Sequence, residues 1–470
     1  MGSRSVAGML TFLRFVVPVP GRQFRNRAVG KHVARPYDVS PFGATIRREH
    51  RAGAKNSQRE KPRVRTGIIA LFLMGMLLIC PAARPQTVDI RETLTLDRHR
   101  PIPIVRIHPW RFLRERAETA TDWLKDETGL SLGVSDTIIY QIDPFISTPH
   151  HTIVNSLDVF GVWHLLESRT FGEGVLGFLF RNRTNVGPLT GNTLSNDVGL
   201  PWGVNNSGST GYARFNQLWW QQSLLGESLV IQLGKVDEKT HFNTNRVASS
   251  DGREFLMQSM VYSQTVAFPA EGLGFDVRYW LTKRWYLDFG LADANGNPEN
   301  KPNDSLNSFS KGQYFEAAEL GVSPELGWLW SGLGESHYRM MGWYTAHTAT
   351  HEGGGGASLS VDQEIPYSLV PFVRIGYAPA KINRTWVEVD SGIVSVAPFG
   401  RKGDRLGAGI TWARPTSTSV QNQTAGELFY RLEVVDGLQI TPDIELIFKP
   451  AQNPTSNFEA VFGLRLRAFL

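Results

Sequence analysis

Arginine and carboxylate side chains recur at alternate positions of apolar segments, and they are the residues of this chain best suited to polar chemistry. Arg278 follows Asp276 at a spacing of two residues, and Glu319, Arg339 and Arg374 each lie between apolar neighbours. An arginine presents a rigid fork of donors and a carboxylate accepts hydrogen bonds, so together they can bind the hydroxyl groups of a small molecule. Alternatively, these charges pair with one another, which is the commoner use of charged residues that share a face.

The sequence offers no complete catalytic or metal-binding motif beside this set. It contains no G-x-S-x-G, H-E-x-x-H or P-loop pattern. Residues Gly172–Gly177 fit G-x-G-x-x-G, but they lead into a strand rather than a helix, so they do not predict a dinucleotide site. His150 and His151 have no third ligand nearby, and we expect a surface loop there. We therefore expect neither a metal ion nor a cofactor, and we do not expect an enzyme.

The charged positions lie in segments that alternate with a period of two residues, which is typical of β-strands. Residues 273–281 and 285–292 alternate in this way on both sides of a three-residue connection, so they predict a hairpin. In a soluble sandwich the apolar face would be buried, whereas in a membrane barrel it would contact lipid and the polar face would line a lumen. One hairpin does not distinguish the two folds.

The whole pattern favours the barrel. Many of the candidate strands have the ~9–11 residues that a tilted strand needs to cross a bilayer. No apolar helix of spanning length follows residue 80. We predict an all-β, transmembrane antiparallel β-barrel of about sixteen strands at 129–470, preceded by an N-terminal segment, 83–128, with a polar helix at 111–127. The expected strands are 129–142, 153–166, 174–184, 212–222, 228–236, 255–268 (the weakest), 272–281, 284–292, 314–322, 337–346, 367–377, 385–396, 403–413, 427–435, 438–448 and 458–470.

The connections between these strands differ in length, as they do in outer-membrane barrels. The segments 185–211, 293–313 and 347–366 are long and polar, whereas 282–284 and 436–437 are tight turns. Counting strands back from the C-terminus places the two tight turns at opposite ends. The strand assignment is therefore wrong by one, and we expect the error between 314 and 426.

Aromatic residues and the last strand support the same fold. Tyr and Trp side chains near strand ends predict girdles at the membrane interfaces. Every second residue from Leu470 back to Phe462 is apolar, a terminal pattern that the barrel-insertion machinery reads, so this machinery is an expected partner. The predicted girdle residues are Trp285, Tyr286, Tyr338, Tyr344, Tyr377 and Trp412.

The positive net charge belongs to the beginning of the chain. Residues 1–65 contain 15 Lys or Arg and 3 Asp or Glu, whereas residues 66–470 contain 34 and 41. The rest of the chain is therefore acidic, and a nucleic-acid partner is not expected. The only cysteine is Cys80, so the exported chain is expected to have no disulfide bond.

The apolar run 67–80 follows three basic residues and precedes small residues near Ala82. This order is typical of a secretory signal peptide, which we place at 61–82, so that residues 1–82 are removed. The long basic segment before it, residues 1–60, is unusual for a bacterial signal peptide. An upstream start codon assigned in error explains it, and a mitochondrial or plastid presequence is the rival.

Several phrases resemble the carbohydrate-selective porins of the OprB type, and the resemblance covers roughly 129–470. It implies a monomeric sixteen-stranded barrel in the Gram-negative outer membrane, filled with water and narrowed by inward loops. Such a barrel passes monosaccharides such as glucose by passive diffusion, and its other partner is outer-membrane lipid. The phrases are GKVDEKTHFN (234–243), FPAEGLGFDV (268–277), LADANGNP (291–298), VPFVRIGY (370–377), GDRLGAGITW (403–412), LQITPDIELIFKPAQNP (438–454) and the terminal FGLRLRAFL.

On this reading the charged face becomes the lining of the pore, where binding must stay weak for a solute to leave. We predict donors for sugar hydroxyl groups, carboxylate acceptors and one aromatic side chain that lies against the sugar ring. The alternatives are a general diffusion porin, an outer-membrane barrel hydrolase, a gated transporter and a soluble lectin-like sandwich. The helix of segment 83–128 is expected at the periplasmic mouth or in the lumen. The predicted lining residues are Arg278, Arg339, Arg374, Asp276, Glu319, Trp343, Arg181 and Arg431.

Overall fold

The computed structural model describes most of the chain from His108 onward, together with a few residues before it. The described residues are Ile90, Thr93, Leu94 and the ranges 104–105, 108–146, 149–207, 211–250, 252–299, 301–327, 329–379, 382–417 and 420–470. The predicted leader at 1–82, its signal peptide at 61–82 and Cys80 lie outside the described residues.

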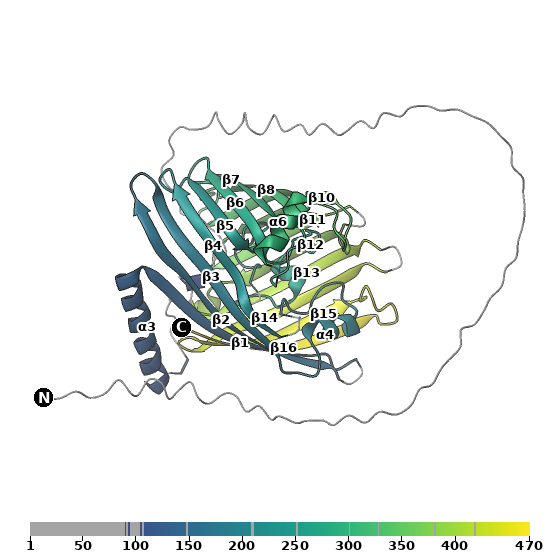
Figure 1. The fold of residues 1–470 in the computed structure, drawn as a ribbon. Coiled ribbons are helices and arrows are strands. Elements are labelled where there is room, and N and C mark those ends of the chain that lie inside the picture. Colours follow the sequence, from purple (N-terminus) through teal and green to yellow (C-terminus); the bar gives the residue numbers. More distant parts are fainter. Residues whose placement is uncertain are drawn as a thin grey trace, which may run out of the picture. The chain divides into compact units, whose positions relative to one another are not determined.

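Sixteen antiparallel strands form one closed barrel, in which β1 pairs with β16 and every other pair joins consecutive strands (Figure 1). The closing pair aligns Ser135 with Phe469 and Ile142 with Phe462. A closed sheet has no unpaired edge, so its backbone groups bond within the wall. The predicted all-β antiparallel barrel is confirmed. The strands are β1 (Leu130–Ile142), β2 (His151–Ser168), β3 (Gly172–Asn185), β4 (Tyr212–Leu224), β5 (Leu229–Val236), β6 (Gly272–Trp280), β7 (Trp285–Asp293), β8 (Tyr314–Val322), β9 (Ser336–Thr345), β10 (Gly354–Gln363), β11 (Leu369–Tyr377), β12 (Thr385–Ser395), β13 (Arg405–Pro415), β14 (Gln423–Val435), β15 (Leu438–Phe448) and β16 (Phe458–Phe469).

The wall turns its apolar side chains outward and most of its charged side chains inward. In β9, Arg339 and Trp343 are buried, whereas Met340 and Tyr344 are exposed. A soluble sandwich would bury the apolar set instead. The outward apolar face is that of a barrel in lipid, which settles the question that the hairpin at 273–292 left open.

Two strand predictions are wrong, and they cancel in the count. Residues 255–268 form no strand; they include the short helix α5 (Gln258–Val261). The segment 347–366 is not one loop, because it contains β10. Since β10 lies between 314 and 426, it is the missing strand that the topology required, and it places the tight turns at 282–284 and 436–437 at the same end of the barrel.

The aromatic residues predicted for the girdles do not all face outward. Trp285, Tyr344, Tyr377 and Trp412 are exposed on the outer face. Tyr286 is buried, and its hydroxyl donates a hydrogen bond to Glu319 Oε1 at 2.7 Å. The prediction for Tyr286 is wrong because the residue shares the inward parity of β7.

In the part of the chain that the structure describes, helices are few, and those that follow β1 lie in the connections between strands. The longest, α3, precedes β1 and agrees with the polar helix predicted at 111–127. No helix among the described residues is long and apolar enough to cross a membrane. The helices are α3 (His108–Thr128), α4 (Gly191–Val198), η1 (Glu238–Thr240), α5 (Gln258–Val261), α6 (Pro302–Ser310) and η2 (Pro398–Gly400).

Candidate functional site

One connection, residues 237–271 between β5 and β6, folds into the barrel, and we call it the inward loop. Its residues 243–246 follow the inner face of β10, whose inward side chains include hydroxyl groups. Asn243 Nδ2 donates to Ser358 Oγ at 2.8 Å, and Ser360 Oγ donates to the carbonyl oxygen of Thr244 at 2.9 Å. The loop therefore forms an inner layer against the wall.

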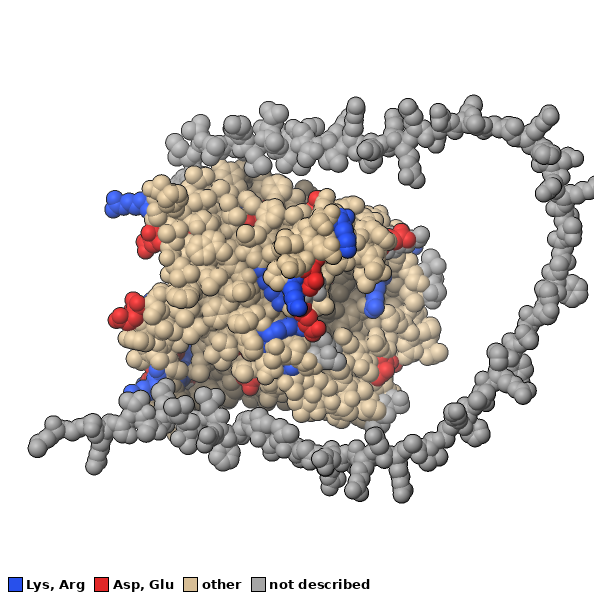
Figure 2. Space-filling model, viewed as in Figure 1, with Lys and Arg blue, Asp and Glu red and all other residues tan. Residues whose placement is uncertain are grey.

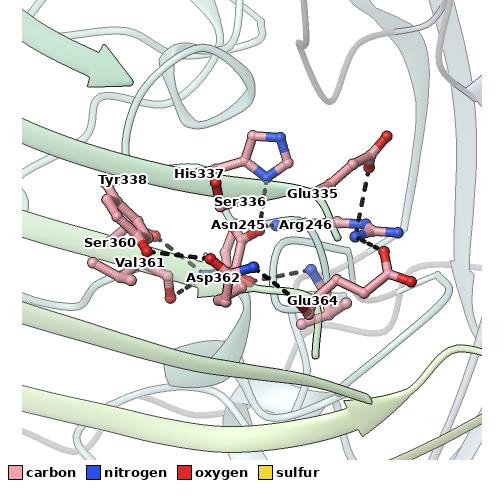
Figure 3. Close-up of polar contacts among 12 residues, drawn as sticks. Asn245, Arg246, Glu335, Ser336, His337, Tyr338, Ser360, Val361, Asp362 and Glu364 are labelled. Atoms are coloured by element: carbon pink, nitrogen blue, oxygen red, sulfur yellow. Dashed lines mark hydrogen bonds and ion pairs between the residues drawn. The ribbon is translucent and has the colours of Figure 1, made fainter. Parts of the chain in front are cut away.

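The inward loop reaches the end of the barrel where the tight turns lie. Arg246 Nη1 forms ion pairs with Glu364 at 2.7 Å and Glu335 at 3.5 Å (Figure 3). Glu335 immediately precedes β9 and Glu364 immediately follows β10. Because the loop begins and ends at the opposite end of the strands, it spans the lumen and divides it.

Aromatic packing and charge-assisted hydrogen bonds hold the loop against the wall. The ring of Phe255 packs edge to face on Phe372 and Phe429, with centroids 5.7 and 4.9 Å apart. Each such pair contributes about 0.5–1.5 kcal/mol beyond the burial of its area. Glu427 Oε2 accepts a hydrogen bond from the backbone N–H of Met257 at 2.9 Å. The loop is thus a packed part of the barrel interior.

Two wall glycines permit this close approach. A Cβ at Gly376 would lie 2.1 Å from Thr265 Oγ1, and one at Gly290 would lie 2.4 Å from the ring of Phe242. Any side chain at either position would displace the inward loop. The wall sequence therefore encodes where the loop lies.

Arg374 and Arg431 bind the loop rather than facing open water. Arg374 is fully buried and donates to the carbonyl oxygens of Ala248 at 2.6 Å and Met260 at 3.3 Å. Arg431 Nη1 donates to the carbonyl oxygen of Arg253 at 3.0 Å. In this structure both guanidinium groups fix the backbone of the loop.

Arg278 and Arg339 form ion pairs with acidic residues of the wall. Arg278 Nε donates to Asp288 Oδ2 at 2.9 Å, and Arg339 Nη1 lies 3.2 Å from Asp362 Oδ2. All four side chains are buried. Of the two uses that the sequence left open for these arginines, the structure shows pairing between charges.

Glu319, Trp343 and Asp276 also lie behind the loop. Glu319 Oε2 accepts a hydrogen bond from the backbone N–H of Asn243 at 2.9 Å. Trp343 is buried in an apolar cluster between the wall and the loop. Asp276 Oδ2 lies 3.8 Å from His241 Nε2. These inward side chains contact the loop in the described structure.

The pKa values of loop residues agree with a packed interior. Burial, with the nearby Arg278 guanidinium, lowers the pKa of His241 to about 3. Burial, with the neighbouring Asp276 carboxylate, raises the pKa of Glu238 well above its usual range. At neutral pH His241 is therefore neutral, and Glu238 resists ionisation. Both shifts are expected of groups that lack the solvation of an open passage.

A cavity of about 200 Å³ lies open between the inward loop and the inner face of β1–β4. Of the predicted lining residues, only Arg181 lines it. Its Nε and Nη2 atoms donate to the two carboxylate oxygens of Asp158, each at 2.7 Å. In Figure 2 the charged side chains gather around a recess, and the surface beside it carries few of them. The cavity is the candidate site for a passing solute.

Most residues that line this cavity were missing from the predicted set, and four of them show why. Arg183 and Arg467 come from β3 and β16, and Arg253 and Tyr262 come from the inward loop. The two wall arginines could have been predicted from the sequence, since each lies on the polar side of the alternation in its strand. The two loop residues carried no such signal: Tyr262 lies in the segment 255–268, which was predicted as a strand of the wall, and Arg253 lies in the connection before it, whose path no alternation reveals.

The N-terminal segment contributes to the same cavity. Ile90 and Thr93 line it, and the carbonyl oxygen of Thr93 accepts a hydrogen bond from Arg253 Nη2 at 3.2 Å. Ile90 and Leu94 are buried in a cluster with inward side chains of β2–β5, such as Trp219. The segment thus reaches the lumen, while α3, which follows it, lies at the rim.

A buried Asp–His pair in the wall is the nearest approach to a hydrolase site. His337 Nδ1 lies 2.7 Å from Asp362 Oδ1 (Figure 3). Its Nε2 atom has no hydrogen-bond partner among the described residues, so none of their hydroxyl groups is bonded to it as a nucleophile. Within the described part of the chain, no group of three or more His, Cys, Asp or Glu side chains could hold a metal ion.

The family whose sequence pattern matches this barrel is described as "Carbohydrate-selective porin, OprB family", and the match covers residues 181–351 and 344–468. The chain belongs to the OprB family. Porin barrels of this kind are outer-membrane proteins. A porin family and a barrel fold indicate a channel rather than an enzyme.

Known proteins that resemble this OprB-family porin agree with the assignment. Porin AaxA of Chlamydia pneumoniae is 21% identical over 319 residues, covering 64% of this chain and 69% of that protein. Porin AaxA of Chlamydia abortus is 22% identical over 318 residues, covering 64% and 67%. The high-pH structure of Pseudomonas putida OprB superposes with a TM-score of 0.62 at 13% identity, covering 75% of this chain and 97% of that one. This last likeness confirms the fold.

Proposed function

We propose that this porin gives passive, sugar-preferring diffusion of monosaccharides such as glucose through the cavity beside the inward loop. The observation that carries the proposal is the chemistry of the lining. Arg181 and Asp158 form a fixed donor–acceptor pair, and the hydroxyl groups of Ser156 and Ser250 lie around the same space. The rings of Phe160 and Tyr262 supply flat surfaces for the C–H faces of a sugar.

The size and exposure of these groups favour weak binding of a small solute. The cavity of about 200 Å³ is smaller than the ~300–1,000 Å³ of most ligand pockets, so it favours a monosaccharide over an oligosaccharide. The arginine and the carboxylate already pair with each other, so a sugar exchanges hydrogen bonds with them instead of filling an empty site. A solute that binds in this way can also leave.

Liposome swelling with the purified porin tests the proposal. We expect arabinose and glucose to enter faster than a disaccharide, and faster than an uncharged amino acid of similar size. Equal rates for solutes of equal size would instead indicate a general diffusion porin. Absence of swelling from folded, heat-modifiable protein would exclude a channel. The monomeric state, the contact of the last strand with the insertion machinery and export by the signal peptide remain predictions.

The lumenal part of the N-terminal segment is expected to restrict this path. We predict that the double substitution Ile90→Ser and Leu94→Ser raises single-channel conductance, because it removes the apolar contacts that hold the segment against Trp219 and its neighbours. Ile104→Ser is the matched control, since Ile104 is exposed. Unchanged conductance of the double variant would show that the segment leaves the path free.

A further inference from the structure

One face of α3 is fixed to the rim of the barrel at the end with the tight turns. Trp110 Nε1 donates to the carbonyl oxygen of Asp436 at 2.7 Å. The buried Arg114 lies 3.0 Å from Asp436 Oδ1, and its guanidinium stacks over the ring of Phe469 at 5.3 Å. These contacts join the helix to the β14–β15 turn and to the last strand, and Figure 1 shows α3 beside the C-terminus. The orientation of α3 about its axis is therefore determined.

The opposite face of α3 exposes large apolar side chains. Phe112, Leu113 and Trp123 are 56%, 62% and 61% exposed. Phe112 and Trp123 are separated by eleven residues, about three helical turns, so they lie on one side of the helix. Asp122 and Lys125 are exposed on a different side. Phe112, Leu113 and Trp123 form an apolar stripe. The exposed charged residues Arg116 and Glu127 each follow one of its rings by four residues and therefore lie beside the stripe, and the Arg116 guanidinium lies over the Phe112 ring at 5.1 Å.

The apolar stripe continues the lipid-facing surface of the barrel. Trp163 of β2 faces outward, and its Nε1 donates to the carbonyl oxygen of Thr128, the last residue of α3, at 2.9 Å. Leu165, near the end of β2, and Phe171, in the β2–β3 turn, are also exposed. Through these side chains the apolar outer surface of the wall extends as far as the rim where α3 lies. A Trp whose polar edge bonds at such a border is typical of the membrane interface.

We propose that α3 lies in the plane of the membrane interface, with Phe112, Leu113 and Trp123 directed toward the acyl chains of the adjacent leaflet. The partner of this surface is the phospholipid bilayer. An amphipathic helix with aromatic residues on one face and charges on another binds at this depth. The long side chains of Arg116 and Glu127 then extend from beside the stripe to the headgroups, and Asp122 and Lys125 face water. This placement does not depend on which solute the barrel passes.

Depth-dependent fluorescence quenching tests the proposal. Trp123→Cys and Asp122→Cys are made separately in a Cys80→Ser background, labelled with a small fluorophore and reconstituted in phosphatidylethanolamine–phosphatidylglycerol vesicles with quencher on both sides. At position 123 we expect strong quenching by lipids with a nitroxide near the headgroup and weak quenching by iodide. At position 122 we expect the reverse. Leu233→Cys, on the outer face of β5, is the control for a lipid-facing label, and Phe112→Cys is a second site on the stripe.

Two results would overturn the assignment to lipid. If iodide quenches the labels at 123 and 122 equally, the apolar stripe faces water. If the label at 123 is shielded from both iodide and lipid nitroxide while the label at 233 is quenched by lipid, protein covers the stripe instead of the bilayer.

Discussion

Replacing residues 244–262 of the inward loop by a short Gly-Ser linker is expected to raise single-channel conductance several-fold and to abolish the preference for monosaccharides. The loop spans the lumen, and the open cavity is the space that it leaves beside β1–β4. The replacement is compatible with the fold, because Val236 and Gly272 are already paired where β5 ends and β6 begins. Removal of the loop would also expose the arginines that now bind it.

Planar-bilayer recording measures this effect. The matched control is removal of residues 302–310, which form α6 in the β7–β8 connection at the same end of the barrel. This control should leave conductance close to that of the unaltered porin, since no residue of α6 lines the cavity. If the two deletions have the same effect, the inward loop does not lie across the path.

Arg374→Met is expected to lower the free energy of unfolding by about 3 kcal/mol, because removing one partner of a buried ion pair leaves the other charge uncompensated. Arg374 is fully buried, and its Nη1 lies 3.9 Å from Asp390 Oδ2, which is also fully buried. The substitution also leaves the carbonyl oxygens of Ala248 and Met260 without their donor. Urea unfolding in lipid vesicles, followed by tryptophan fluorescence, measures the change.

Two further variants test the cause of this destabilisation. Arg169→Met removes an exposed arginine of the β2–β3 turn, and we expect it to change stability by no more than about 0.5 kcal/mol. Adding Asp390→Asn to Arg374→Met should recover part of the loss, because it removes the uncompensated carboxylate. A change below about 1 kcal/mol for Arg374→Met would contradict its role as an anchor of the loop.

The sequence predicted the wall well because membrane strands obey a strict alternation. Lipid accepts only apolar side chains on the outer face, so each outward position is constrained and the period of two is visible. Arg339 and Trp343 fall on the inward parity of β9, as the sequence indicated. The number of strands was also predictable, although two opposite errors contributed to it.

Both errors have a physical cause. The segment 255–268 resembles a strand because Phe255 and its neighbours are apolar, but these side chains pack against the inner wall and not against lipid. By contrast, β10 begins with the glycines 354–356, which resemble a loop, and its inward side chains are small and polar, such as Ser358 and Ser360. The period of two is visible only where a strand has apolar side chains on its outer face. The signal is therefore weak in a short strand that begins with glycines.

The candidate site was less predictable than the wall, because alternation gives the face of a residue but not what covers it. Arg181 and Arg374 have the same inward parity, yet one lines the cavity and the other is buried under the loop. The path of the inward loop depends on contacts distant in sequence, such as the ion pair of Arg246 with Glu364. No period in a single sequence encodes such pairs. Most of the predicted arginines were therefore placed on the correct face but away from the cavity.

The central claim is that sugar passes between the inward loop and the inner face of β1–β4, and cysteine modification during glucose uptake tests it most directly. Gln217→Cys lies in the cavity lining and Ser358→Cys lies behind the loop, each in a Cys80→Ser background. We predict that a bulky methanethiosulfonate stops glucose-driven liposome swelling for the variant at 217 and leaves swelling unchanged for the variant at 358. If modification stopped swelling for the variant at 358 and left it unchanged for the variant at 217, sugar would pass behind the loop, and the central claim would be wrong.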